Sequence, residues 1–408
     1  MKWDKFFWAL AIIGFLVGLL GLVQRATLGH TAVAYNTYVP WGLWVAAYIY
    51  FIGLSAGAFL LSTLVYVFGF ERLAKIGKLA LWTALVTLVA ALFSIWLDLG
   101  HVWRFWRLLF HTNFRSIMGW MIWLYLFYFV LLVVELWFAM RADLVACSDE
   151  SGLRSRLCRF LTFGKTNLSE VAIKRDKKVL QVLGSIGVPL AVAFHGSVGA
   201  IFGVVGARPY WHSGLTPIAF LVGALLSGGA LLTFITSIWG PNRGTSEHRE
   251  LVLYLGRITL LLLALDVLIE WAEYSIALWH AVPAEAESVR LVLFGPYWWV
   301  FWIMHLGFGV IIPGILLIVG RRSSTATAIA AALVAITFIA VRVNIVIPGL
   351  AVEELKGLRL AFSGPGLTFD YFPTTTEWLF FIWTASLAGL LFLIGYSILP
   401  LVRTESAP

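Results

Sequence analysis

The sequence predicts an all-α protein that crosses a membrane about ten times. Of its 408 residues, 61% are hydrophobic and only 12% are charged, and the mean hydropathy is +0.91. A soluble domain carries about 25% charged residues, so this composition excludes a soluble fold. The apolar residues also gather into ten runs, each long enough to cross a bilayer as a helix.

The ten expected helices follow one another with mostly short loops between them. No small-residue cleavage site follows the first run, so we expect a retained helix there and not a signal peptide. Two loops are long: 141–178 is rich in Arg and Lys, and 348–374 contains Glu353, Glu354 and Asp370. The expected helices cover residues 6–24, 43–70, 77–98, 116–140, 179–205, 213–239, 251–280, 295–320, 325–347 and 375–400.

A weak internal repeat predicts how the helices are grouped. Asp98 ends the third helix, and Glu270 and Glu273 lie near the end of the seventh. A Trp-rich stretch follows each, and the next helix opens with GWMIW (119–123) or GPYWWVFW (295–302). We therefore expect two parallel four-helix bundles, at about 43–205 and about 213–347. Helices 1 and 10 would flank them, within one membrane domain that takes up residues 1–408.

The Lys and Arg residues predict the orientation. With these boundaries, 19 of the 29 lie on the side of the two termini and eight on the opposite side. Cytoplasmic loops carry the excess of positive charge, so we expect a multi-pass protein of the cell membrane with both termini in the cytoplasm. The net charge of +8 is then a topology signal, and no nucleic-acid partner is expected. Many of the 20 tryptophans lie near helix ends, as in an interfacial belt.

The cysteines and histidines suggest no metal or haem site. Cys147 and Cys158 are eleven residues apart in one polar loop, which is no iron–sulfur or zinc pattern. We expect them to be ordinary loop thiols. A haem needs paired histidines on neighbouring helices, whereas the eight histidines mostly lie in loops or at helix ends.

Charged and imidazole groups gather in the half of the membrane opposite the termini, here called the outer half. Asp98 and His101 lie at the outer end of helix 3, and His195 lies past the middle of helix 5. An acid at the centre of a membrane helix costs about 2.5–3.5 kcal/mol on insertion scales. Because of this cost, charged residues inside membrane helices usually belong to a functional site.

The second expected bundle adds more polar groups at a similar depth. Asp266, Glu270 and Glu273 have i, i+4 and i+7 spacing, which places them on one helix face. Arg342 in helix 9 is available to pair with these acids, and His305 lies near the middle of helix 8. We expect the acids of both bundles to line one polar cavity that opens to the outer face.

Each of these residues also has an ordinary structural explanation. Asp98 and His101 could be wetted by headgroup water, Arg342 could form a structural ion pair, and His195 could be a packing histidine. A shared cavity explains all of them together. A histidine opposite a carboxylate suits a quinone headgroup, because each carbonyl needs a hydrogen-bond partner and protons must move with the electrons.

Four stretches resemble the NrfD/PsrC family of quinone-reactive membrane subunits of redox complexes. They are most similar to its ten-helix branch, which includes HybB-like, DsrP-like and alternative complex III subunits. They cover nearly the whole chain in the family's order. The stretches are VPWGLWVAAYIYFIGLSAGAF (39–59), WLDLGHVWR (96–104), FHGSVGAIFG (194–203) and FSGPGLTFDYFPTTTEWLFFI (362–382).

The resemblance implies a subunit that carries no metal, haem or iron–sulfur cluster itself. A quinone or quinol would bind near the outer face, where a ferredoxin-like iron–sulfur subunit would dock. Asp98 and His195 match the aspartate and histidine that flank the quinone in the ten-helix branch. Arg342 and the helix 7 acids resemble proposed proton-path residues. Eight-helix members surround the quinone with an Asn, a His and a Tyr, a set that the sequence does not place.

We therefore expect a quinone-binding membrane subunit of a respiratory oxidoreductase complex. It would exchange electrons between the quinone pool (menaquinone or ubiquinone) and the iron–sulfur partner, among further redox subunits and membrane lipids. Asp98 and His195 would be catalytic, His101 would shape the entrance, and Asp266, Glu270, Glu273, Arg342 and His305 would form a proton path. The alternatives are an ion-coupled secondary transporter and a purely structural anchor.

Overall fold

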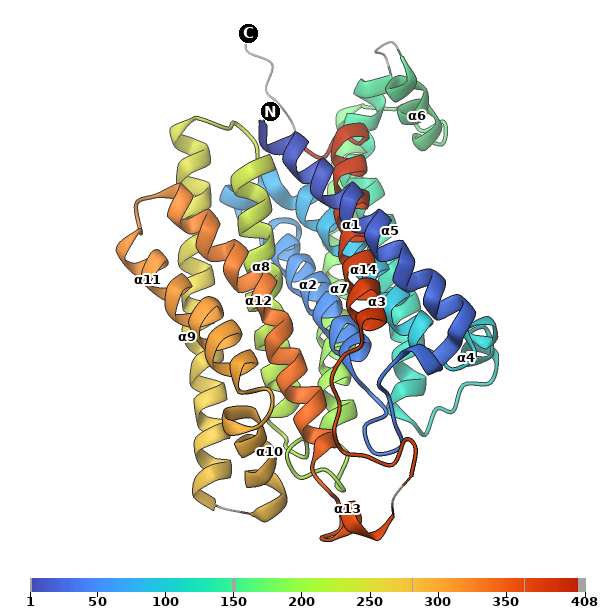
Figure 1. Cartoon of the computed structure of the whole chain (residues 1–408). Coiled ribbons are helices and arrows are strands. Elements are labelled where there is room, and N and C mark those ends of the chain that lie inside the picture. The colour runs from blue at the N-terminus through green and yellow to red at the C-terminus, as the bar shows by residue number, and fades with distance from the viewer. Residues whose placement is uncertain (1, 149–151, 281, 363, 403–408) are drawn as a thin grey trace.

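The computed structural model describes residues 2–148, 152–280, 282–362 and 364–402, and these ranges contain helices and loops but no β-strand. Ten segments are long and apolar enough to span a membrane, which confirms the predicted fold class. They run side by side, and the start of α1 lies at the same end of the molecule as the end of α14 (Figure 1). They are α1 (Lys2–Leu28), α2 (Leu43–Tyr66), α3 (Gly77–Asp98), α5 (Ile117–Ser148), α7 (Glu170–Gly203), α8 (Thr216–Trp239), α9 (Ser246–His280), η4 (Val300–Ile311) with α11 (Ile312–Val319), α12 (Ser324–Ala351) and α14 (Thr375–Ile398).

The long basic loop is largely helical, unlike the prediction. α5 continues to Ser148, and α7 already begins at Glu170, after an N-cap in which the Ala172 amide donates to Ser169 Oγ. The short helix α6 (Leu153–Leu161) lies between them. Hydropathy does not detect these extensions because Lys, Arg and Glu are good helix formers that lower the hydropathy. The other short helices are α4 (Arg107–Phe110), α10 (Pro283–Phe294) and α13 (Leu358–Ala361).

Cys147 and Cys158 form a disulfide, so the expectation of ordinary loop thiols was wrong. Cys147 lies in the last turn of α5 and Cys158 in α6, and both are buried. α6 folds back onto α5, where Ser155 Oγ donates to the Ser148 carbonyl at 2.8 Å. The spacing of eleven residues could not reveal this return because it depends on the unpredicted helix α6.

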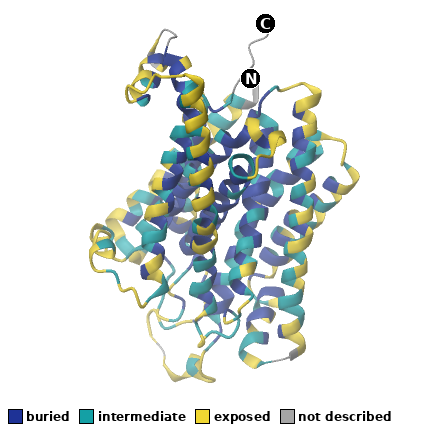
Figure 2. Cartoon of the chain, turned by 180° about the vertical axis from the view of Figure 1, so that it is seen from behind, coloured by how far each residue is buried: buried dark blue, intermediate teal, exposed yellow. Residues whose placement is uncertain are grey.

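We call α2, α3, α5 and α7 the first group of helices and α8, α9, η4 and α12 the second; α2 and α7 of the first group also contact α8 of the second. α2 contacts α3 and α7, and α5 contacts α3 and α7. On the other side, α12 contacts α8, α9 and η4, while α1 pairs with α14, which packs on α3. Buried residues concentrate where the groups meet and exposed residues face outward, as expected for lipid-facing helices (Figure 2).

The two groups meet at the close crossing of α2 and α8. A Cβ added at Gly57 would lie 1.9 Å from the Ala224 carbonyl oxygen, and one at Gly228 would lie 2.6 Å from the Gly57 Cα. Small residues allow membrane helices to approach closely where no hydrophobic force drives association. Of the 24 residues of α2, 20 are accordingly buried, so it forms the centre of the molecule.

Candidate functional site

A cavity of about 1110 Å³ lies among α2, α3, α5 and α7, at the end of α3 away from the termini. Its wall is mostly aliphatic and aromatic, with a few polar groups, as in typical small-molecule sites. Phe105, Leu108, Met118 and Leu126 line it and are exposed.

The C-terminal end of α3 is held by groups from the first helix and the turn after it. Arg25 Nε donates to the Leu97 carbonyl and Nη2 to the Leu99 carbonyl, each at 2.8 Å. His30 Nε2 lies 3.0 Å from the Asp98 carbonyl oxygen. The last carbonyls of a helix have no partner within it and carry partial negative charge. Arg25 satisfies them and fixes Asp98, whose carboxyl group lines the cavity.

Three buried polar atoms beside this helix end make no well-formed hydrogen bond to a described residue, although the Tyr35 hydroxyl and the Asp98 carboxyl are close enough to interact with each other. They are Asp98 Oδ1, the Tyr35 hydroxyl and Asn36 Nδ2, and all three residues line the same cavity. Burial, and next the neighbouring Asp98 carboxyl, raise the pKa of Tyr35, so its hydroxyl remains a donor. A buried polar atom without a partner costs about 1–3 kcal/mol. This cluster is therefore ready to bind a polar group that enters the cavity.

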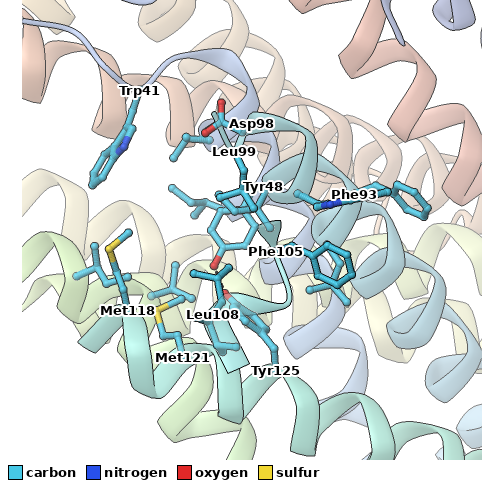
Figure 3. Close-up of a pocket in the computed structure, with 18 of the residues that line it drawn as sticks. Trp41, Tyr48, Phe93, Asp98, Leu99, Phe105, Leu108, Met118, Met121 and Tyr125 are labelled. Atoms are coloured by element: carbon cyan, nitrogen blue, oxygen red, sulfur yellow. Dashed lines mark hydrogen bonds between the residues drawn. The ribbon is translucent and has the colours of Figure 1, made fainter. Parts of the chain in front are cut away.

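A second polar point lies on the wall formed by α2 and α5. The hydroxyl groups of Tyr48 and Tyr125 are hydrogen-bonded to each other. In Figure 3 these hydroxyls point toward one another, with Asp98 above them and Met121 beside them. The cavity thus offers polar groups at two levels with apolar surface between them.

The structure separates Asp98 from the other two residues predicted to bind a quinone. His101 is exposed and does not line the cavity. His195 is fully buried and faces α8, where its Nε2 lies 2.8 Å from the Phe220 carbonyl oxygen. Val198, one turn along α7, does line the cavity, so His195 lies behind the wall.

The sequence suggested that the acids of both bundles line one common cavity, but in the structure they do not. Glu270 of α9 pairs with His305 of η4, at 2.6 Å between Oε2 and Nε2. Arg342 has no ion pair to a described carboxylate; its guanidinium carbon lies 4.5 Å from the Phe220 ring centre and 5.0 Å from that of Phe338. Asp266 interacts with it electrostatically only. Asp98 and these groups therefore occupy two separate places.

His305 lies in an unusual helix. η4 is a π-helix over twelve residues, and π-helical turns are rare and often mark functional sites. It contains Gly307 and Gly309, and Pro313, which has no amide hydrogen, follows it. His305 itself is 3% exposed, so η4 holds a buried imidazole against a carboxylate.

Breaking the Glu270–His305 pair is expected to destabilise the protein. Removing one partner of a buried pair costs about 3–5 kcal/mol. We expect His305→Ala to lower the free energy of unfolding toward this range, and Glu270→Gln less, because Gln retains hydrogen bonding. Glu273→Gln is the matched control on the same helix face, because Glu273 bonds to no described residue. Thermal unfolding of the purified variants measures this, and equal losses in all three would contradict the pair.

Several site residues were not predicted from the sequence. Tyr35 and Asn36 lie in a loop, and Tyr48 and Tyr125 lie in ordinary apolar helices. Glu377 is fully buried, near Asp98, and accepts a hydrogen bond from Tyr371. An acid near the start of the last helix was a usable signal, although the capping box with Thr374 explains it equally well.

We also searched the described ranges for side chains that could form a metal site. No group of three or more His, Cys, Asp or Glu there could hold a metal ion. The polar groups of the cavity are a carboxylate, hydroxyls, an amide and an imidazole. These are hydrogen-bonding and proton-exchanging groups.

Comparison with known proteins gives a consistent picture. The chain is similar to a subunit of selenate reductase from Mesobacillus selenatarsenatis, 37% identical over 96% of this chain and 92% of that one. The Hdr-like menaquinol oxidoreductase integral membrane subunit of Archaeoglobus fulgidus is 28% identical over 89% and 85%. The menaquinone reductase integral membrane subunit of Nitratidesulfovibrio vulgaris is 22% identical over 100% and 93%.

The family model described as polysulphide reductase, NrfD, matches residues 31–353. This range runs from the loop before α2 to the end of α12 and contains Asp98, His195, Glu270, His305 and Arg342. It covers most of the chain, and the resemblance seen in the sequence is thereby confirmed. The chain belongs to the NrfD family of polysulphide reductase-type integral membrane proteins.

Proposed function

We propose that this protein is the quinone-binding membrane subunit of a multi-subunit oxidoreductase. The observation that carries the proposal is the cavity lined by Asp98, Tyr35 and Asn36, whose buried polar atoms have hydrogen-bonding capacity that the described residues do not use. The names of two relatives, a menaquinol oxidoreductase subunit and a menaquinone reductase subunit, support the same substrate class. Menaquinone is therefore the quinone that we favour.

The cavity residues can both hydrogen-bond a quinone and exchange protons with it. A quinone takes up two electrons and two protons to become a quinol, and the reverse reaction releases them. The Tyr35 hydroxyl and the Asn36 amide can donate hydrogen bonds to a carbonyl oxygen. The Asp98 carboxyl can give or accept a proton, which is a general acid–base role.

We assign different roles to His195 and His101. His195 would act through α7, because it anchors this wall of the cavity to the Phe220 carbonyl while its Nδ1 has no described partner. It would be a positioning residue. His101 would lie at the entrance, next to exposed Trp103.

The partner subunit should dock on the side of the cavity. Loop residues there expose large apolar side chains: Leu355 is 71% exposed and Leu360 is 90% exposed. Arg208 holds the base of this loop, since its Nη1 donates to the Val352 carbonyl at 2.7 Å and its Nη2 pairs with Glu354 at 2.9 Å. A ferredoxin-like iron–sulfur protein on this surface would bring electrons near Asp98.

The orientation predicted from positive charge has a direct test. We expect a cysteine at Lys356 to react with an impermeant thiol reagent on intact cells, and one at Thr166 to react only after permeabilisation. Both are placed in the Cys147→Ser, Cys158→Ser background, so that no native thiol contributes. Labelling of the Thr166 position alone would place the cavity on the cytoplasmic side.

Proton coupling has two candidate routes. One is the Glu270–His305 pair with Asp266 and Glu273. The other runs along α2 and α5 below the cavity, where the Tyr128 hydroxyl lies 3.3 Å from Ser55 Oγ. Beyond them the Glu135 carboxyl is buried without a described partner, about 15 Å along α5 from Tyr125 at 1.5 Å per residue. These groups could carry protons toward the side of the termini.

The transporter alternative makes a different demand on the structure. Transporter sites lie near the midplane between repeats, at broken helices. The large cavity instead lies within one helix group and near the membrane surface. Among the described spans, only the one that contains η4 departs from a continuous α-helix, because η4 is a π-helix. No residue of η4 lines the cavity. The quinone proposal uses the cavity, whereas the transporter leaves it unexplained.

Ligand stabilisation tests the proposal on the purified protein. A menaquinone analogue at 100 times its dissociation constant should stabilise the folded state by about 2.7 kcal/mol. Val198→Trp fills the cavity and should abolish the rise in melting temperature. Val192→Trp, on the exposed face of the same helix, should leave it intact. No rise in the native protein, or an equal rise in all three, would refute binding in the cavity.

A further inference from the structure

A second, smaller pocket lies far from the cavity, between α9, α11 and the start of α12. Its volume is about 240 Å³. The turn between α11 and α12 shapes it, and Arg249 Nη2 fixes this turn by donating to the Arg322 carbonyl at 2.7 Å. The pocket is lined by Leu253, Gly256, Arg257, Leu260, Leu317, Ile318, Arg321 and Thr327.

Two arginines in this pocket lack a counter-ion within the described part of the chain. Arg257 and Arg321 are exposed, and neither forms a hydrogen bond or ion pair to a residue described here. α9 has 35 residues, more than the about 20 that cross a bilayer, so Arg257 lies near the membrane surface on the side of the termini, beside Arg321 in the same pocket. Lipid headgroups occupy this level of the membrane.

The remaining walls identify the kind of anion. Leu253, Leu260, Leu317 and Ile318 form an apolar lining, and the Thr327 hydroxyl is the polar group near the arginines. A soluble anion gains nothing from aliphatic walls, whereas a lipid places a phosphate beside its own acyl chains. Guanidinium groups match phosphate geometry with paired donors. Basic pockets between membrane helices are known to bind lipid headgroups.

We propose that Arg257 and Arg321 bind the phosphodiester headgroup of an anionic phospholipid, with its acyl chains along the aliphatic wall. The lipid comes from the leaflet on the side of the termini. It supplies the missing negative charge and joins α9 to the turn before α12. This site is independent of the quinone cavity, and its failure would leave the proposed function intact.

Native mass spectrometry of the purified chain with defined lipids tests this site. We expect phosphatidylglycerol to remain bound in preference to phosphatidylcholine. Each positive charge near an anionic headgroup contributes about fivefold in affinity. The Arg257→Gln, Arg321→Gln double variant should therefore bind phosphatidylglycerol about 25-fold more weakly. Arg257→Lys with Arg321→Lys retains the charges and should retain most of the preference.

The matched control removes two cations elsewhere on the same side. Arg175→Gln with Arg243→Gln has the same net charge as the pocket variant, and both residues are exposed and outside the pocket. It should bind phosphatidylglycerol like the native protein. Equal losses in both glutamine variants, or equal binding of phosphatidylcholine, would overturn the proposal. Displacement of the lipid by millimolar inorganic phosphate would identify a soluble anion as the ligand and also overturn it.

Discussion

Asp98→Asn is expected to lower quinone-linked electron transfer by about 10²–10⁴-fold, the usual contribution of a positioned general acid or base. Asparagine keeps the size of the side chain but cannot accept or release the proton. The caps from Arg25 and His30 bind backbone carbonyls, so the end of α3 should remain in place. The measurement is quinol oxidation or quinone reduction by the intact complex in membranes.

Two comparisons give this result its meaning. Electron transfer from the iron–sulfur partner to an artificial acceptor should persist, because it does not use the cavity. Glu287→Gln, which changes an exposed acid on the same side but outside the proposed docking loop, should leave turnover unchanged. His195→Ala should impair turnover less than Asp98→Asn, mainly through KM, because His195 lies behind the wall. Normal turnover in an assembled Asp98→Asn variant would exclude this carboxyl from the chemistry.

Gly228→Ala is expected to destabilise the whole helix assembly by about 1–3 kcal/mol or more, the usual cost of overpacking. The added methyl group would lie 2.6 Å from the Gly57 Cα and from the Ala58 amide nitrogen, and 2.7 Å from the Leu54 carbonyl oxygen. All three are backbone atoms, so no side-chain rotation can relieve the contact. α2 and α8 would have to separate, and both helix groups depend on that crossing.

The neighbouring glycine supplies the control. At Gly229 the nearest atoms to an added methyl group are side-chain carbons of Leu61 and Leu262, at 3.5 and 3.9 Å. Gly229→Ala should therefore be neutral or slightly stabilising, since alanine favours the helix. Thermal unfolding of the two purified variants decides between them. Equal melting temperatures would show that α2 and α8 do not cross closely at Gly228.

The sequence predicted the number and order of the spanning helices because hydrophobic length is a local property. The missed parts depend on other signals. The start of α7 is set by charged helix formers and a Ser169 cap, which a hydropathy window does not detect. The disulfide depends on the return of α6 along α5, and no spacing rule contains that return.

Only part of the site was predicted, because only part of it has a local sequence signal. Asp98 was found because an acid at the end of an apolar run is conspicuous. Tyr35, Asn36 and Tyr125 are not, since each has an ordinary place in a loop or a membrane helix. The sequence also could not show that Asp98 and Glu270 belong to two different sites. It indicates their similar depth in the membrane, but not which group of helices each side chain faces.

Arg342 shows the limit most clearly. A buried arginine near three acids suggests an ion pair, and sequence spacing cannot show what lies between the helices. In the structure two aromatic rings, Phe220 and Phe338, occupy the space around the guanidinium. The pairing partner of Glu270 is instead His305, which comes from the π-helix η4. Helical periodicity assumes 3.6 residues per turn and does not describe that segment.

Photo-crosslinking with an azido-menaquinone tests the central claim most directly, because it locates the ring without requiring turnover. The intact complex is irradiated in native membranes, and the modified peptides of this chain are identified by mass spectrometry. The cavity predicts labels within 35–49, 89–109 and 118–129, and their loss when excess menaquinone competes. Labels confined to α9, η4 and α12, with none in those three ranges, would contradict a quinone site beside Asp98.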